Sequence, residues 1–136
     1  GLGFANKTSN DLYQYMRSKG YSDAILKETG LPVTYYAWPE DDLQHPVPDL
    51  PYIVFYYPKM RIEPADDHVA GQIAQINIEL YTNEKDFETE QTVEEILDKY
   101  SLIYSKGETY LKDESMYEVL YITEAVIDRV EVTNEN

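Results

Sequence analysis

The sequence contains no cysteine among its 136 residues. Disulfide bonds, thiolate catalysis and cysteine-based zinc sites are therefore excluded. Basic residues are scarce as well: 11 Lys and Arg stand against 26 Asp and Glu, a formal net charge of -15 at pH 7. This balance argues against independent binding to nucleic acid or to an anionic membrane surface, because both depend on Lys and Arg. No apolar run approaches the ~18 residues of a membrane span, so we expect no membrane contact.

The residues that are present predict a folded chain. A length of 136 residues is typical of one domain, and 43% of the residues are apolar in spite of the charge. The aromatic residues are 14 Tyr, 3 Phe and 1 Trp. Tyrosine suits half-buried strands and protein interfaces alike, and composition does not choose between them. We expect a single domain over residues 1–136, with flexible ends at 1–7 and 130–136.

Helix signals occur in two parts of the chain. Near the start, Ser9 or Asn10 begins a weak helix that ends before Gly20, and Ser22 begins a shorter one that ends at Gly30. Later, Asp86 caps a helix with acidic residues in its first turn. The apolar stripe of this later helix follows the i, i+3, i+4, i+7 pattern and consists of Val93, Ile96, Leu97 and Tyr100.

Strand signals occur in five segments. A continuous apolar run between two prolines predicts a central strand covered on both faces, and strict alternation in the next segment predicts one solvated face. The predicted strands are Leu31–Trp38, Tyr52–Tyr57, Gln72–Tyr81, one that starts at Leu102–Ser105 with a turn near Gly107, and Met116–Ile127. Together with the helices they predict an α+β domain: a mostly antiparallel sheet of about four to five strands with two helices packed on one face.

Residues with recognisable chemistry are few. Asp66, Asp67 and His68 are adjacent, but no second histidine stands at a metal-binding spacing, and the other one, His45, lies in a proline-rich loop. No glycine-rich phosphate loop and no nucleophile-elbow serine occur. We therefore expect no catalytic residues, no metal site, no cofactor and no enzymatic activity.

Several short motifs, taken in order, resemble the tail-completion, or tail-terminator, proteins of long-tailed phages and prophages of Gram-positive bacteria. The resemblance extends from about Leu26 to Ile127, and the longer N-terminal segment departs from it. The motifs are Thr29–Glu40 (TGLPVTYYAWPE), Leu50–Tyr57 (LPYIVFYY), Ala65–Val69 (ADDHV), Ile78–Asp86 (IELYTNEKD), Tyr104–Tyr110 (YSKGETY) and Tyr117–Tyr121 (YEVLY).

This resemblance implies a structural virion protein. Members of the family form a ring, typically a hexamer, that caps the tail tube, ends its polymerisation and joins the tail to the head connector. The partners implied are further copies of the chain, the tail-tube protein and the head-connector protein, with DNA passing through unbound. The implied location is the virion, and the host cytoplasm during assembly. The charge of -15 predicts that free subunits stay monomeric.

The long connection Lys59–Gly71 is the most unusual feature, since hairpin loops seldom exceed about five residues. We expect it to project from the sheet and order against a neighbouring subunit or the tube end; a solvated loop without a partner is the alternative. The interaction residues expected are Lys59, Met60, Arg61, Ile62, Asp66, Asp67, His68 and Val69. Two other functions remain open: an acidic inhibitor that mimics DNA, and a small enzyme with an unrecognised site.

Overall fold

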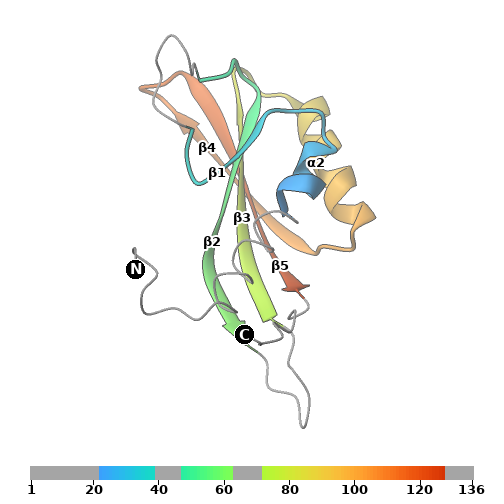
Figure 1. The fold of residues 1–136 in the computed structure, drawn as a ribbon. Helices are drawn as coiled ribbons and strands as arrows, with labels where there is room; N and C mark the ends of the chain where they lie inside the picture. The colour runs from blue at the N-terminus through green and yellow to red at the C-terminus, as the bar shows by residue number, and fades with distance from the viewer. Residues whose placement is uncertain (1–21, 39–46, 63–71, 128–136) are drawn as a thin grey trace, which may run out of the picture.

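The computed structural model describes residues 22–38, 47–62 and 72–127, which form one five-stranded sheet with helices beside it (Figure 1). The strand order is β1-β2-β3-β5-β4, and every neighbouring pair is antiparallel except β1 with β2. The elements are β1 (Val33–Tyr35), β2 (Tyr52–Ile62), β3 (Gln72–Thr82), α2 (Phe87–Lys99), β4 (Tyr104–Leu111) and β5 (Met116–Ile127), with residues 22–27 also helical. The predicted α+β class is confirmed.

Both helical segments lie on the same face of the sheet, as Figure 1 shows. A hydrogen bond links the C-terminal ends of the two segments: Lys99 Nζ donates to a carboxylate oxygen of Glu28 at 2.7 Å. The core fills the space between these helices and the alternate inward-facing positions of the strands. Its buried members are Leu26, Val33, Ile53, Phe55, Ala74, Ile76, Ile78, Leu80, Val93, Leu97, Val119 and Tyr121.

Helix α2 forms where the sequence predicts it. The Asp86 side chain accepts a hydrogen bond of 3.0 Å from the backbone N–H of Thr89, which satisfies one of the unpaired donors of the first turn. Val93 and Leu97 of the apolar stripe are fully buried. The helix also buries Glu90, a residue that the hydrophobic pattern assigns to solvent.

Several predicted boundaries are wrong for local reasons. Strand β2 does not stop at Pro58, because a register shift between Tyr56 and Lys59 accommodates the proline and pairing with β3 resumes. The strand therefore continues through Lys59–Ile62, which the sequence predicts as loop. Strand β4 likewise runs through Gly107, where the backbone does not need a left-handed conformation, and the turn lies at 112–115.

The first strand is shorter than predicted. Strand β1 spans Val33–Tyr35 because Tyr36, at φ 72°, leaves the extended conformation. The predicted left-handed helix end is confirmed at Gly30, with φ +83°. The expected helix of residues 9–20 and the flexible ends lie outside the described residues.

Candidate interaction surface

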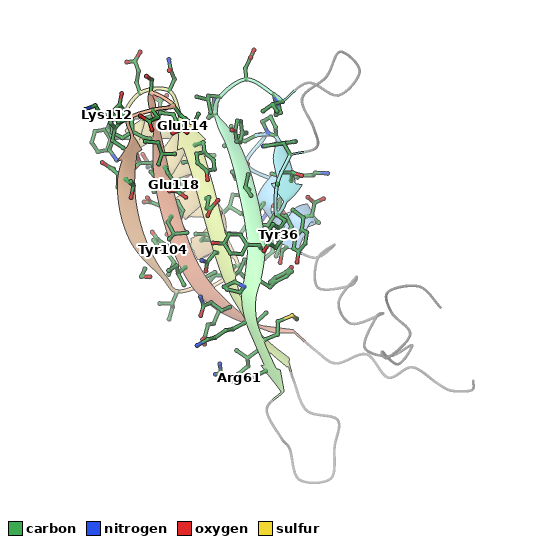
Figure 2. The ribbon with its side chains drawn as sticks, turned by 90° about the vertical axis from the view of Figure 1, so that its left-hand side faces the viewer. Tyr36, Arg61, Tyr104, Lys112, Glu114 and Glu118 are labelled. Atoms are coloured by element: carbon green, nitrogen blue, oxygen red, sulfur yellow. The ribbon has the colours of Figure 1, made fainter. Side chains whose placement is uncertain are left out.

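One face of the sheet carries no helix within the described residues, and we call it the open face. Figure 2 looks onto this face. The strand registers and the two-residue alternation of side chains assign its members. They include Tyr52, Val54, Tyr56, Lys59 and Arg61 of β2; Gln75, Asn77, Glu79 and Tyr81 of β3; and Glu118, Leu120, Ile122 and Glu124 of β5. Unlike a typical solvated sheet face, it is rich in aromatic residues.

Aromatic rings cover part of the open face. The Tyr52 ring lies 5.5 Å from that of Trp38 and 5.4 Å from that of Tyr81, between centroids. The Tyr36 ring, which follows β1, lies 5.6 Å from the ring of Tyr56. Val54 is only 5% exposed, so this part of the face is well packed. The outermost ring, that of Tyr36, is 69% exposed.

Two carboxyl groups meet at a tyrosine hydroxyl on the same face. Tyr81 donates a hydrogen bond of 2.8 Å to Glu79 Oε1, and its hydroxyl lies 3.3 Å from Glu118 Oε2. Burial and the charge of Glu79 raise the pKa of the Glu118 carboxyl, although the Tyr81 hydroxyl partly opposes the effect. The ionised form of Glu118 is therefore disfavoured in the folded protein.

We expect Glu118→Gln to raise the melting temperature at pH 7. A carboxyl with a raised folded-state pKa lowers the free energy of unfolding when it is ionised. This penalty shrinks as the pH falls below that pKa and is absent below the unfolded-state pKa. The difference from the wild type should thus shrink in acid. Glu124→Gln is the matched control on the same strand and face, where only an exposed pair with Arg61 at 3.6 Å is lost. A lower melting temperature for Glu118→Gln at pH 7 would contradict the assignment.

Strand β4 forms one edge of the sheet, and an ion-pair network attaches it to α2. Lys106 Nζ lies 2.9 Å from Glu90 Oε1 and 2.6 Å from Glu94 Oε2. Lys85 pairs with Glu90 at 2.5 Å and also with Glu108 of β4. Burial alone would raise the pKa of Glu90, but the hydrogen bonds from the two lysines outweigh it and lower this pKa. The network therefore holds β4 in place from the helix side.

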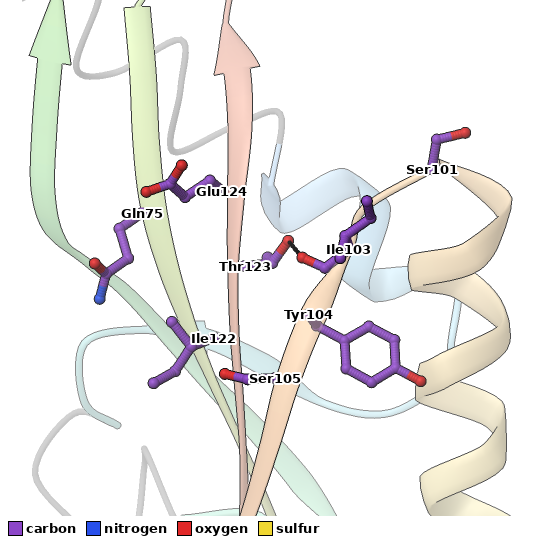
Figure 3. Close-up of a pocket in the computed structure, with 8 residues that line it drawn as sticks. All are labelled: Gln75, Ser101, Ile103, Tyr104, Ser105, Ile122, Thr123 and Glu124. Atoms are coloured by element: carbon purple, nitrogen blue, oxygen red, sulfur yellow. Dashed lines mark hydrogen bonds between the residues drawn. The ribbon is translucent and has the colours of Figure 1, made fainter.

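A shallow hollow of about 530 Å³ lies at the start of β4 (Figure 3). Within it, Thr123 Oγ1 donates a hydrogen bond of 2.7 Å to the carbonyl oxygen of Ile103. The Ile103 side chain at its rim is 89% exposed. The lining residues are Gln75, Ser101, Ile103, Tyr104, Ser105, Ile122, Thr123 and Glu124. They combine apolar side chains with hydroxyl, amide and carboxylate groups, a mixture that suits contact with another protein surface.

Four of the interaction residues predicted from the sequence, residues 59–62, lie on β2. Met60 packs against the core, while Arg61 lies on the open face and pairs with Glu124. Lys59 is exposed on β2, and Ile62 ends that strand. The other predicted residues, Asp66, Asp67, His68 and Val69, lie outside the described residues, as does His45.

The Glu79–Tyr81–Glu118 cluster was missed by sequence reasoning. Alternation in β3 places Glu79 on a solvated face, but only the pairing of β3 with β5 brings Glu118 beside it. In the described part of the chain, no three metal-binding side chains gather in a group that would hold an ion. Among the helices of those residues, none is long and apolar enough to cross a membrane.

Comparison with known proteins finds similarity among solved structures. No protein-family model matches the chain, and no curated protein sequence matches it. Among solved structures, a similar chain comes from one described as the virion of a native gene transfer agent particle. The two chains are 16% identical with a TM-score of 0.49, over 82% of this chain and 90% of that chain.

Proposed function

We propose that this protein is a structural component of a phage-type virion rather than an enzyme. In this role copies of the chain form a ring that caps the tail tube, ends its polymerisation and joins the tail to the head connector. The observation that carries the proposal is the open face of the sheet. Within the described residues no helix covers it, yet it presents packed tyrosine and tryptophan rings beside partly desolvated carboxyl groups.

The chemistry of this face suits protein–protein contact. Tyrosine and tryptophan are enriched at interfaces because a large apolar ring carries a polar group that finds a partner. Here the rings are already packed against one another, so little side-chain freedom is lost when a partner binds. The exposed ring of Tyr36 is placed by a backbone hydrogen bond of 2.8 Å to the Phe55 carbonyl. A surface prepared in this way supports an assembly role.

The resemblance to tail-terminator proteins is the reason for proposing a ring on the tail tube rather than another assembly. Its first motif, Thr29–Glu40, contains β1 and the aromatic residues that follow it onto the open face. The motif Leu50–Tyr57 enters β2, and Ile78–Asp86 runs from β3 to the cap of α2. The residues that carry the resemblance thus overlap those that build the proposed surface.

The proposed partners are other copies of this chain, in a hexamer, together with the tail-tube and head-connector proteins. The protein would act in the virion, at the interface of head and tail, after assembly in the host cytoplasm. Its charge of -15 keeps free subunits apart and repels the phosphate backbone of DNA that passes through the ring. Neither the inhibitor nor the enzyme alternative is favoured by a specific group of residues in the described structure.

The proposal is tested by complementing a phage that lacks this gene. The deletion should yield unjoined heads and tails with tubes of irregular length, and the wild-type gene should restore joined particles in electron micrographs. Tyr36→Ala should lower the phage titre about tenfold or more, since loss of one interface aromatic weakens binding by ~1.4 kcal/mol or more.

The matched control is Phe87→Ala, which removes an aromatic side chain of similar exposure, 72%, at the start of α2. Its titre should equal that of the wild type. Normal joined particles from the deletion would contradict the proposed function. Full complementation by Tyr36→Ala, with the wild type required, would contradict only the assignment of the open face.

A further inference from the structure

The outer edge of β4 is unpaired in the part of the chain that the structure describes. Strand β4 is eight residues long, and its partner there is β5 alone. Residues 105–110 are all exposed. Such an edge presents backbone N–H and C=O groups that can pair with a strand of another chain.

Natural proteins commonly protect exposed edges with proline, with β-bulges or with outward-pointing lysine. Strand β4 contains no proline, and its register with β5 is continuous from Tyr104 to Leu111. Its lysine, Lys106, binds Glu90 and Glu94 on the helix side. Strand β4 therefore has neither a proline nor a bulge against strand addition, and its lysine is engaged on the helix side.

A second unpaired edge lies at the other end of the same sheet. Strand β1 pairs with only three residues of β2, Ile53–Phe55, so the outer edge of β2 beyond Tyr56 has no strand beside it within the described residues. Figure 1 shows this half of β2 extending past β1. Pro58 and the adjacent register shift limit regular pairing to Lys59–Ile62.

The directions of these two edges are compatible. Strand β2 is antiparallel to β3, β3 to β5, and β5 to β4, so β4 runs opposite to β2. If the next copy repeats the same orientation, its β2 meets β4 as an antiparallel pair. The contact joins two different surfaces, and such head-to-tail contacts generate rings when the rotation closes.

Charge disfavours the pairing of two β2 edges. The free half of β2 carries two cations, Lys59 and Arg61, on the open face of the sheet. On β4, Glu108 lies on the helix side, where a lysine neutralises it. The open-face positions of β4 carry no charge: they include Ser105, Gly107 and Thr109. Two β2 edges would therefore bring like charges together, whereas β2 against β4 does not.

We propose that β4 of one subunit adds antiparallel to residues 59–62 of β2 in the next subunit, so that the sheets continue around an oligomer of this chain. The proposal rests on the proposed function only in that both require a second copy as partner. It also gives Lys59 and Arg61 a role in assembly that does not depend on the connection beyond Ile62.

The absence of native cysteine allows a direct test by cross-linking. Thr109→Cys places a thiol on β4 and Lys59→Cys places one on β2, at exposed positions. Each variant is treated with a short bismaleimide in high salt, alone and mixed with the other, with a mass tag on one of them. Gln91→Cys, exposed on α2, replaces Thr109→Cys in the matched control.

The mixture should form cross-linked heterodimers about tenfold faster than either variant alone or the Gln91→Cys control, because pairing raises the effective thiol concentration. If two copies of Thr109→Cys cross-link to each other at that rate, the proposal is wrong, because β4 then pairs with β4 of another copy in a two-fold contact. Oligomers seen by light scattering without these cross-links would overturn the strand pairing and leave the ring intact. A monomer under all conditions, including added tail tubes, would contradict the proposed ring as well.

Discussion

Glu90→Gln is expected to destabilise the protein by about 3 kcal/mol at pH 7, near the lower end of the range for breaking a buried ion pair. The Glu90 side chain is 2% exposed and pairs with Lys85 and Lys106. Glutamine keeps the shape but removes the charge, and both lysines are then held close together without the central carboxylate. Because Lys85 and Lys106 are partly exposed and retain Glu108 and Glu94, the loss should not exceed this estimate. Urea unfolding at equilibrium measures it.

The same variant should respond differently to pH. The pKa of Glu90 is lower in the folded protein than in an unfolded chain, so its contribution to stability is present above the unfolded-state pKa and is lost as the pH falls through the folded-state pKa. The wild type should therefore lose more stability than Glu90→Gln between neutral and acidic pH. Glu95→Gln, an exposed change in the same helix, is the control and should stay within about 0.5 kcal/mol of the wild type. Equal acid sensitivity of wild type and Glu90→Gln would contradict this account.

Tyr121→Ala is expected to destabilise the protein by about 3–5 kcal/mol, the range for removing a buried aromatic ring. The side chain is fully buried, packs edge-to-face on Tyr104 at 5.4 Å, and donates a hydrogen bond of 2.8 Å to Glu94. Tyr121→Phe keeps the ring and removes only the hydroxyl, with its hydrogen bond to Glu94 and a longer one of 3.5 Å to the Glu90 carbonyl oxygen, so it should lose about 1 kcal/mol. The two variants separate packing from hydrogen bonding in the same unfolding experiment.

The outcome for Tyr121 also bears on the interface at β4. Because this ring supports Tyr104 and, through Glu94, the contact between α2 and β4, its loss should loosen the edge strand before the rest of the sheet. Relative to the wild type, the variant should then show a larger increase in hydrogen-exchange rate for the amides of β4 than for those of β2 and β3. Uniform acceleration across the sheet, or a loss below about 1 kcal/mol for Tyr121→Ala, would show that this ring is not central to the packing.

Local patterns were sufficient for most of the elements. The alternation of Gln72–Tyr81 and the limits of Met116–Ile127 correspond to β3 and β5, and the capping residue of α2 is Asp86 as predicted. These features depend on near neighbours in the chain, so a short window of sequence contains the necessary information. The α+β class follows from their order.

Other features depend on contacts that no local pattern contains. The hydrophobic stripe of α2 does not predict the burial of Glu90, because its two lysines come from outside the helix. Pro58 predicts the end of a strand because proline has no backbone N–H to donate. Pairing with β3 nevertheless resumes at Lys59, so β2 continues to Ile62. The sequence therefore predicts a loop at Lys59–Ile62, although these residues form the free half of β2.

The sequence by itself determined the charge, the absence of thiols, the kinds of elements and their order along the chain. Tertiary structure decided which strands became neighbours, and hence that Glu118 lies beside Tyr81 and that β4 and the free half of β2 occupy opposite edges. The physical reason is that side-chain periodicity specifies the face on which a residue lies, whereas strand order and register arise from packing among segments far apart in the chain.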